Sequence, residues 1–158
     1  RYDDMIDFDP DTWTYINVAE AAIRGSEIGF QYRQHHTGWR LAYNFYHKED
    51  RLTGEPLLRR PRATVTGAFH TRWNRLGCHL ALTYNTSRED FDYSAWPASR
   101  VELDPFLLLD IAFTYRVREN MEAVFRGQNI TDETYEMVKG YGTPGSTWYA
   151  GIRLTMQR

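Results

Sequence analysis

The chain has 158 residues, which fits one domain, and its 19 basic and 21 acidic side chains give a formal net charge of −2. No basic patch dominates, so the composition disfavours nucleic acid as a partner. The mean hydropathy is −0.63, and no apolar run approaches the ~18–20 residues of a membrane-spanning helix. Aromatic residues reach 15%, which suits a membrane-interface girdle and equally a carbohydrate-binding sandwich.

The first part of the chain predicts one hairpin. We expect a strand over Arg1–Phe8 and a turn at Asp9–Thr12, because proline fixes φ and aspartate bonds its own backbone. The chain then returns from Tyr15 to Arg33 with alternating apolar and polar residues, the period of a strand. Gly25 interrupts this segment and predicts a bulge or a kink.

The middle of the chain continues with the same period of two. Its predicted strands are Trp39–Phe45, Ala63–Trp73, Cys78–Tyr84 and Leu107–Val117. Leu57–Pro61 opens the second of them, since Pro61 cannot donate to a ladder and fits a strand start. The connections alternate in length, with short turns at 34–38, 74–77 and 118–120 and long loops at 47–55 and 87–99.

The last third contains two strands around one long polar loop. Met121–Arg126 alternates, and Trp148–Met156 collects its apolar residues on one face. The separation of short turns from long loops is typical of outer-membrane proteins. The sequence therefore predicts an all-β fold, and the pattern alone fits an antiparallel up-and-down transmembrane β-barrel with about eight strands and a soluble antiparallel sandwich about equally well.

Alternation also assigns the two faces of this wall. One face is expected to meet lipid, and it comprises Trp39, Leu41, Tyr43, Phe45, Leu80, Leu82, Leu107, Leu109, Ile111, Phe113, Ile152 and Leu154. The polar face is expected to line a lumen, and it comprises Arg40, Asn44, Thr64, Thr66, His70, Arg72, Thr83, Asn85, Asp110, Thr114, Arg126, Gln128 and Arg153.

A motif in the last loop carries a family resemblance. Its residues are Asn129, Asp132, Tyr135, Gly140, Tyr141, Pro144 and Gly145, followed by the final strand. This pattern resembles the closing segment of TonB-dependent outer-membrane receptors, which have Asn-Leu-Phe-Asp, then Gly-Tyr-x-x-Pro-Gly-Arg, then a last strand. Ile130-Thr131 and Ser146 replace Leu-Phe and Arg here. Leu57–Pro61 is similar to a feature of cobalamin and catecholate-siderophore receptors.

The resemblance implies a function and a set of partners. Residues 1–158 are expected to be the carboxy-terminal portion of a receptor barrel, part of a larger barrel, with no plug domain. The implied function is uptake of a scarce nutrient chelate, cobalamin or a ferric siderophore, across the outer membrane of a Gram-negative bacterium. The implied partners are outer-membrane lipid, the plug and other strands of the receptor or another outer-membrane protein, and indirectly the TonB energy-coupling complex.

Few residues could carry catalytic or binding chemistry, and we predict no enzyme, cofactor or metal site. The exposed loop aromatics Tyr93, Trp96 and Tyr141 are the candidates for ligand or partner contact, although simple loop packing explains them equally well. The loops at 87–99 and 131–145 are expected on one side of the barrel, the cell exterior. Glu89-Asp90 is expected to be solvated loop charge. His70 and His79 flank one turn and could meet across the hairpin, although two solvated wall residues are favoured.

Two alternatives stay open at this point. A reduced stand-alone barrel with an anchoring role in an outer-membrane complex needs only eight strands, and it requires Arg1–Phe8 to pair with Trp148–Met156. A soluble β-sandwich or lipocalin-like binding module would instead bury the faces that we assign to lipid.

Overall fold

The computed structural model describes residues 2–9, 12–50, 54–94 and 96–156. The described residues form strands β1 (Tyr2–Asp9), β2 (Thr14–Gln34), β3 (Thr37–Asp50), β4 (Ala63–Trp73), β5 (Leu76–Asn85), β6 (Arg88–Asp92), β7 (Ser99–Leu103), β8 (Phe106–Arg118), β9 (Met121–Gln128), β10 (Glu136–Val138), β11 (Tyr141–Gly142) and β12 (Thr147–Leu154). None of them forms a helix that is long and apolar enough to cross a membrane.

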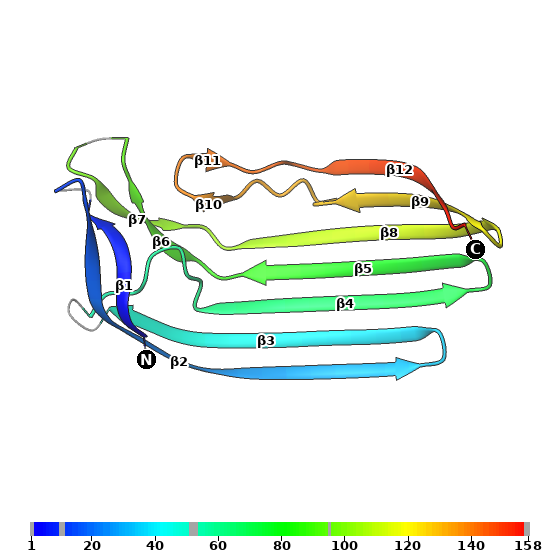
Figure 1. Cartoon of the computed structure of the whole chain (residues 1–158), viewed down its shortest axis with the longest axis horizontal. Coiled ribbons are helices and arrows are strands. Elements are labelled where there is room, and N and C mark those ends of the chain that lie inside the picture. The colour runs from blue at the N-terminus through cyan, green and yellow to red at the C-terminus, as the bar shows by residue number, and fades with distance from the viewer. Residues whose placement is uncertain (1, 10–11, 51–53, 95, 157–158) are drawn as a thin grey trace.

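Eight of these strands form one antiparallel sheet, in the order β1-β2-β3-β4-β5-β8-β9-β12. Tight turns join β2 to β3, β4 to β5 and β8 to β9 at one end, and the long connections lie at the opposite end (Figure 1). The predicted up-and-down order and the separation of short turns from long loops are both confirmed.

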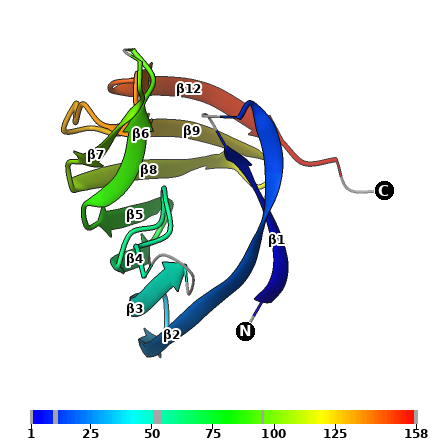
Figure 2. The ribbon, with the colours of Figure 1, turned by 90° about the vertical axis from the view of Figure 1, so that its left-hand side faces the viewer.

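The sheet is curved but open. Seen from the long-loop end, its strands follow an arc (Figure 2). In the described part of the chain, β1 pairs with β2 and β12 pairs with β9, and no pairing joins β1 to β12. The closure that a stand-alone eight-stranded barrel requires is therefore not seen among these residues. A single arc also differs from the two packed sheets of a soluble sandwich.

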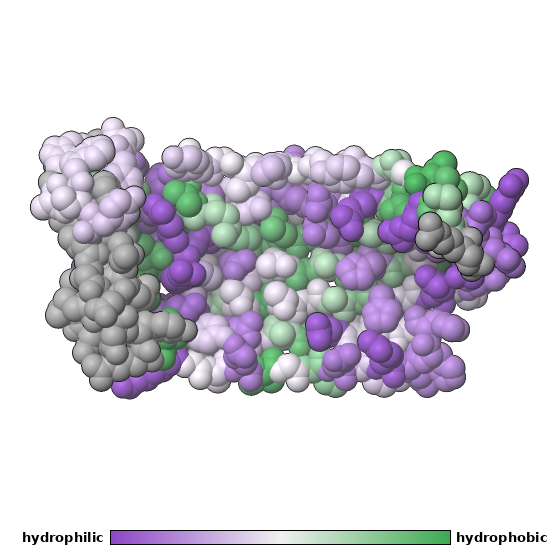
Figure 3. Space-filling model, in the orientation of Figure 1, coloured by the Kyte–Doolittle hydropathy of each residue, from purple (hydrophilic) through white to green (hydrophobic). Residues whose placement is uncertain are grey.

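Cross-strand register confirms the predicted faces. Directly paired residues point to the same side of a sheet, and one apolar row runs through Leu41, Gly67, Leu82 and Leu109. The neighbouring polar row runs through Arg40, Ala68, Ala81 and Asp110. Figure 3 views the hollow side of the arc, and hydrophilic residues extend along it. The apolar set therefore lies on the outer side of the curve, as expected for a lipid-facing wall.

Of the two alternatives predicted for Gly25, a bulge or a kink, the bulge is wrong. The β2–β3 register passes through Gly25 and Tyr46 without a shift, so Gly25 forms no bulge. A Cβ atom at this position would lie 2.2 Å from the Phe45 carbonyl oxygen. Glycine is required here because the neighbouring backbone approaches closely.

Three segments at the long-loop end also differ from the sequence-based expectation. The predicted loop at 87–99 contains most of a hairpin, β6–β7, and the last polar loop contains a smaller one, β10–β11. Leu57–Pro61 precedes β4 and does not belong to a strand, since β4 begins at Ala63. Alternation over so few residues is too short to separate a hairpin from a loop by sequence.

Candidate functional site

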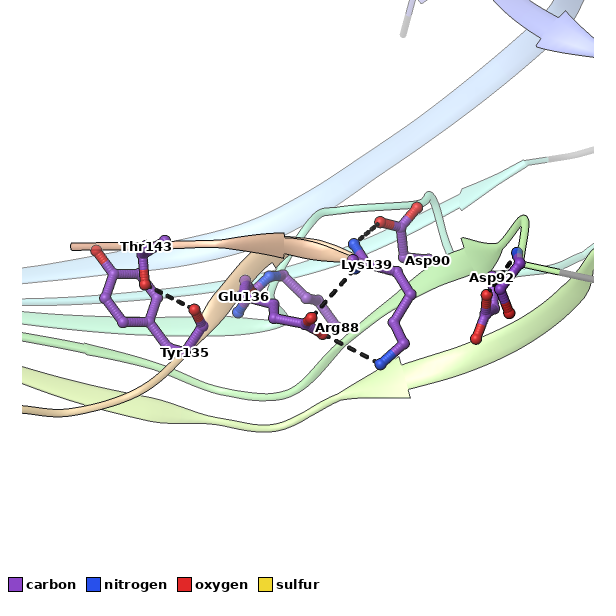
Figure 4. Close-up of polar contacts among 9 residues, drawn as sticks. Arg88, Asp90, Asp92, Tyr135, Glu136, Lys139 and Thr143 are labelled. Atoms are coloured by element: carbon purple, nitrogen blue, oxygen red, sulfur yellow. Dashed lines mark hydrogen bonds and ion pairs between the residues drawn. The ribbon is translucent and has the colours of Figure 1, made fainter. Parts of the chain in front are cut away.

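Asp90 is the centre of a polar cluster at the long-loop end of the sheet. Its side chain is 0% exposed and accepts hydrogen bonds from Arg59 Nε at 2.8 Å, the Lys139 backbone N–H at 2.8 Å and the Phe91 backbone N–H at 2.9 Å. Figure 4 shows the Asp90–Lys139 contact between β6 and the turn after β10. One carboxylate thus holds together three loop segments that are distant in sequence.

Arg88 is the second buried charge of this cluster. It is 4% exposed, its Nη2 donates to the Glu136 carbonyl oxygen, and its guanidinium carbon lies 4.9 Å from the centre of the Phe106 ring. Burial lowers the pKa of Arg88, and the charge of Asp90 opposes this shift. Its Nε and Nη1 atoms are buried and have no hydrogen-bond partner among the described residues. Such unused donors are costly in a folded protein.

A small apolar core supports these charges. Phe106, at the start of β8, is 4% exposed, and its ring centre lies 4.3 Å from that of Tyr135. Leu103 in β7 is also 4% exposed. The Thr143 hydroxyl donates to the Tyr135 carbonyl oxygen at 2.7 Å (Figure 4). Tyr135 of the family-like motif therefore anchors the β10–β11 hairpin to the barrel wall.

The other motif residues build the base of the same loop. Asn129 is 6% exposed; its backbone N–H donates to Asp110 Oδ1, and its side chain both donates to and accepts from the Glu133 backbone at 2.9 Å. Asp132 Oδ1 accepts the Ser146 N–H at 2.8 Å, and a Cβ on Gly145 would lie 2.5 Å from that same oxygen. The motif thus encodes a folded loop base.

Arg100 in β7 adds a bridge on another side of the cluster. It pairs with Glu55 and Glu89 and donates to the Pro56 carbonyl oxygen. Arg59, which reaches Asp90, has a φ of +57°, a conformation that is uncommon for a residue other than glycine. The segment before β4 is therefore held against the β6–β7 hairpin by two arginines.

The three predicted contact residues lie at the surface of this end. Tyr93 is 51%, Trp96 63% and Tyr141 73% exposed, and the Tyr93 ring centre lies 6.1 Å from that of Phe91. The Asp90–Lys139 contact confirms that their two loops lie on one side. Their role in binding stays a prediction.

The structure corrects the expectation for Glu89-Asp90. Asp90 is fully buried and ion-paired, not a solvated loop charge. Sequence reasoning missed both Arg88 and Asp90 as site residues. The only local signal is the alternation of Arg88, Asp90 and Asp92, which does not reveal partners 31 and 49 residues away.

The histidines at the short-turn end form a separate, shallow pocket. His70 and His79 are directly paired across β4 and β5, and the His70 ring occupies the space over Gly38. They line a cavity of about 320 Å³ together with His35 and His36. Among the described residues, no group of three or more His, Cys, Asp or Glu side chains has an arrangement that holds a metal ion.

The fold and its two-faced wall define a class: this is the wall of an outer-membrane-type β-barrel with a structured loop end. Residues 1–130 match the family described as TonB dependent receptor-like, beta-barrel. The chain belongs to this family. Its members are receptors of the Gram-negative outer membrane and are not enzymes.

Solved structures support the same fold. The pyoverdine outer membrane receptor FpvA from Pseudomonas aeruginosa PAO1 is 13% identical, with a TM-score of 0.79 over 97% of this chain and 25% of its own. The ferric-catecholate import receptor Fiu from E. coli K12 is 15% identical, with a TM-score of 0.75 over 96% of this chain and 23% of its own. The copper transporter OprC is 15% identical, with a TM-score of 0.74 over 98% of this chain and 27% of its own. The chain spans about a quarter of the length of these structures.

Proposed function

We propose that residues 1–158 are the carboxy-terminal strands of a receptor that imports a ferric siderophore with energy supplied through TonB. The open sheet carries this proposal, because β1 and β12 both leave an edge without a second neighbour in the described chain. Further strands of the same barrel would cover those edges, and a plug would meet the polar face. Ferric chelates are favoured over cobalamin because structural neighbours include siderophore receptors.

In this proposal the long-loop end faces the cell exterior and receives the ligand. Long loops of such barrels are extracellular, and short turns are periplasmic. Tyr93, Trp96 and Tyr141 supply exposed aromatic surface, and the cluster around Asp90 holds their two loops in a fixed relation. Aromatic side chains on ordered loops are frequent anchors of recognition.

The test uses the full-length receptor in cells. Uptake of radiolabelled ferric siderophores, cobalamin and copper is compared with and without a functional TonB. We expect TonB-dependent accumulation of a ferric siderophore, with binding weakened about tenfold by Trp96→Ala or Tyr141→Ala. Trp73→Ala is the control, because Trp73 is 82% exposed at the opposite end. Uptake of cobalamin or copper alone would contradict the ligand assignment, and equal losses in all three variants would contradict the site.

A further inference from the structure

The polar face of the sheet carries an excess of positive charge in the half next to the short turns. The strand register places six arginines on this part of the face, and we call them the arginine strip: Arg33, Arg40, Arg72, Arg116, Arg126 and Arg153. Among the described residues, the strands of this half carry only two acidic side chains on the same face, Asp110 and Glu122.

Contacts and register place the central arginines over the hollow of the sheet. Arg72 pairs directly with Gly77, and a Cβ atom added to Gly77 would lie 3.9 Å from Arg72 Nε, so the Arg72 side chain lies over this glycine. Arg126 pairs directly with Ala112 and Tyr149. Small neighbours leave room beside the arginines, since Arg72, Gly77 and Ala112 line the same cavity as the four histidines.

Most of this charge has no acidic partner in the described part of the chain. Glu122 Oε2 pairs with Arg153 at 3.4 Å. Asp110 Oδ1 already accepts the Asn129 N–H at 2.9 Å. The members of the strip that form no ion pair with a described carboxylate are Arg33, Arg40, Arg72, Arg116 and Arg126.

The arginine strip is too long for one small ligand. It runs from β2 to β12 across neighbouring strands of the sheet, and strands lie about 4.8 Å apart, so its ends are separated by roughly 30 Å along the curve. Figure 3 shows hydrophilic residues along this hollow side. A charged surface of this length fits a protein segment better than a small chelate.

We propose that the arginine strip docks the plug of the receptor through carboxylates on the plug surface that faces it. Filling the barrel removes water from the polar face, and a desolvated arginine without a partner is strongly destabilising. Aspartate and glutamate pair with guanidinium groups through bidentate, charge-assisted hydrogen bonds. This docking rests on the proposed function, because it requires a plug, and it adds that the plug surface opposite the strip is acidic.

The test is carbodiimide cross-linking of the full-length receptor in phospholipid vesicles without a chelate. The reagent joins an amine to a carboxylate in contact with it, so Arg72→Lys and Arg126→Lys supply the amine and keep the charge. We expect mass spectrometry to find each variant linked to an aspartate or glutamate of the plug. Arg60→Lys, in the segment before β4 at the long-loop end, is the control and should give no plug link. Lys139 and Glu136, whose Nζ and Oε2 lie 3.2 Å apart, are the positive control.

Two results of the cross-linking would overturn the docking. One is a link from the strip variants only to Asp110 or Glu122. The other is no link at all while the positive control is joined.

Charge reversal tests the same contact without a reagent. Arg72→Glu combined with Arg126→Glu should accelerate hydrogen exchange in the linked plug segment about tenfold, and an arginine in place of the linked plug carboxylate should restore the protection. Unchanged plug exchange together with lost binding of a ferric siderophore would assign the strip to the ligand and overturn the docking. TonB-dependent uptake by the unmodified receptor tests the proposed function separately, since a plug link without uptake supports the docking and contradicts only the import.

Discussion

The barrel wall and the loop cluster of this chain differ in which side chains they bury and in what stabilises them. In the wall, every strand of the sheet pairs along its length, and the side chains meet lipid on one face and polar surroundings on the other. Its large apolar residues are accordingly exposed in this chain, as with Trp39 at 53% and Ile152 at 70%. In the loop cluster the buried groups include two charges, Arg88 and Asp90. The wall depends on a repeating pattern, and the cluster depends on a few specific contacts.

This difference explains the two kinds of stability that we expect. A wall residue contributes through transfer from water to lipid, so its effect depends on face and depth. A cluster residue contributes through hydrogen bonds in a site where burial makes an unpaired partner costly. The largest losses of stability are therefore expected from two kinds of substitution: one that adds a charge to the outer face of the wall, and one that removes a charge from the cluster.

Leu80→Arg tests the wall and has the largest expected effect. Leu80 lies near the middle of β5, paired with Phe69 and Ile111 on the outer face, and an arginine near the bilayer midplane costs about 2–4 kcal/mol. Denaturant unfolding of the full-length receptor in phospholipid vesicles measures this loss. Ala81→Arg is the matched control, since Ala81 faces the polar side opposite Asp110, and its cost should stay within about 1 kcal/mol. Equal costs would contradict the assignment of faces.

Asp90→Ala tests the cluster and should cost about 2–3 kcal/mol locally, because hydrogen bonds to charged groups are each worth ~1.5–3 kcal/mol. The change leaves Arg59, the Lys139 N–H and the buried Arg88 without their carboxylate. The total cost is smaller than the sum of the separate hydrogen bonds, because Arg59 is half exposed and water solvates it after the substitution. Hydrogen exchange should accelerate in β6, β7, β10 and β11 and stay unchanged in β4 and β5. Uniform acceleration across the sheet would mean that the cluster also supports the wall.

The same contrast explains how much of the molecule the sequence reveals. Wall strands are predictable because each residue's face follows from its immediate neighbours, and a one-residue slip would invert the whole strand. The cluster is not predictable in this way, because Asp90 finds Arg59 and Lys139 only after the strands of the wall have aligned their ends. The family-like motif identified the last loop, but the roles of Asn129 and Asp132 in folding its base become visible only in the structure.

Gly145→Ala tests whether the Asp132 contact holds the base of the last loop. The added Cβ would lie 2.5 Å from Asp132 Oδ1, which accepts the Ser146 N–H, so the loop must shift at a cost of about 1–3 kcal/mol. Gly142→Ala is the control, because no atom beyond its chain neighbours lies within 4 Å of the position that its added methyl group would take. Limited proteolysis of the loop at 129–146 measures the difference. Equal cleavage of the two variants would show that the Asp132 contact does not hold the loop.

The smallest expected effect is a pH response at the tip of the β6–β7 hairpin. The Ser94 hydroxyl and its backbone N–H, the latter at 2.8 Å, donate to Asp92 and lower the pKa of this carboxyl. Because the pKa of Asp92 is lower in the folded state, the contact stabilises the tip at pH values above the unfolded-state pKa of about 3.9. That contribution is lost as the pH falls through the lower, folded-state pKa. The Ser94 amide shift, followed by NMR from pH 6 downward to about 2, should therefore move only below pH about 4. Asp92→Asn should abolish this transition and leave the amide shifts of β4 and β5 unchanged. If β4 or β5 amides titrate together with Ser94, the hairpin tip and the barrel wall are coupled, which would contradict their separation.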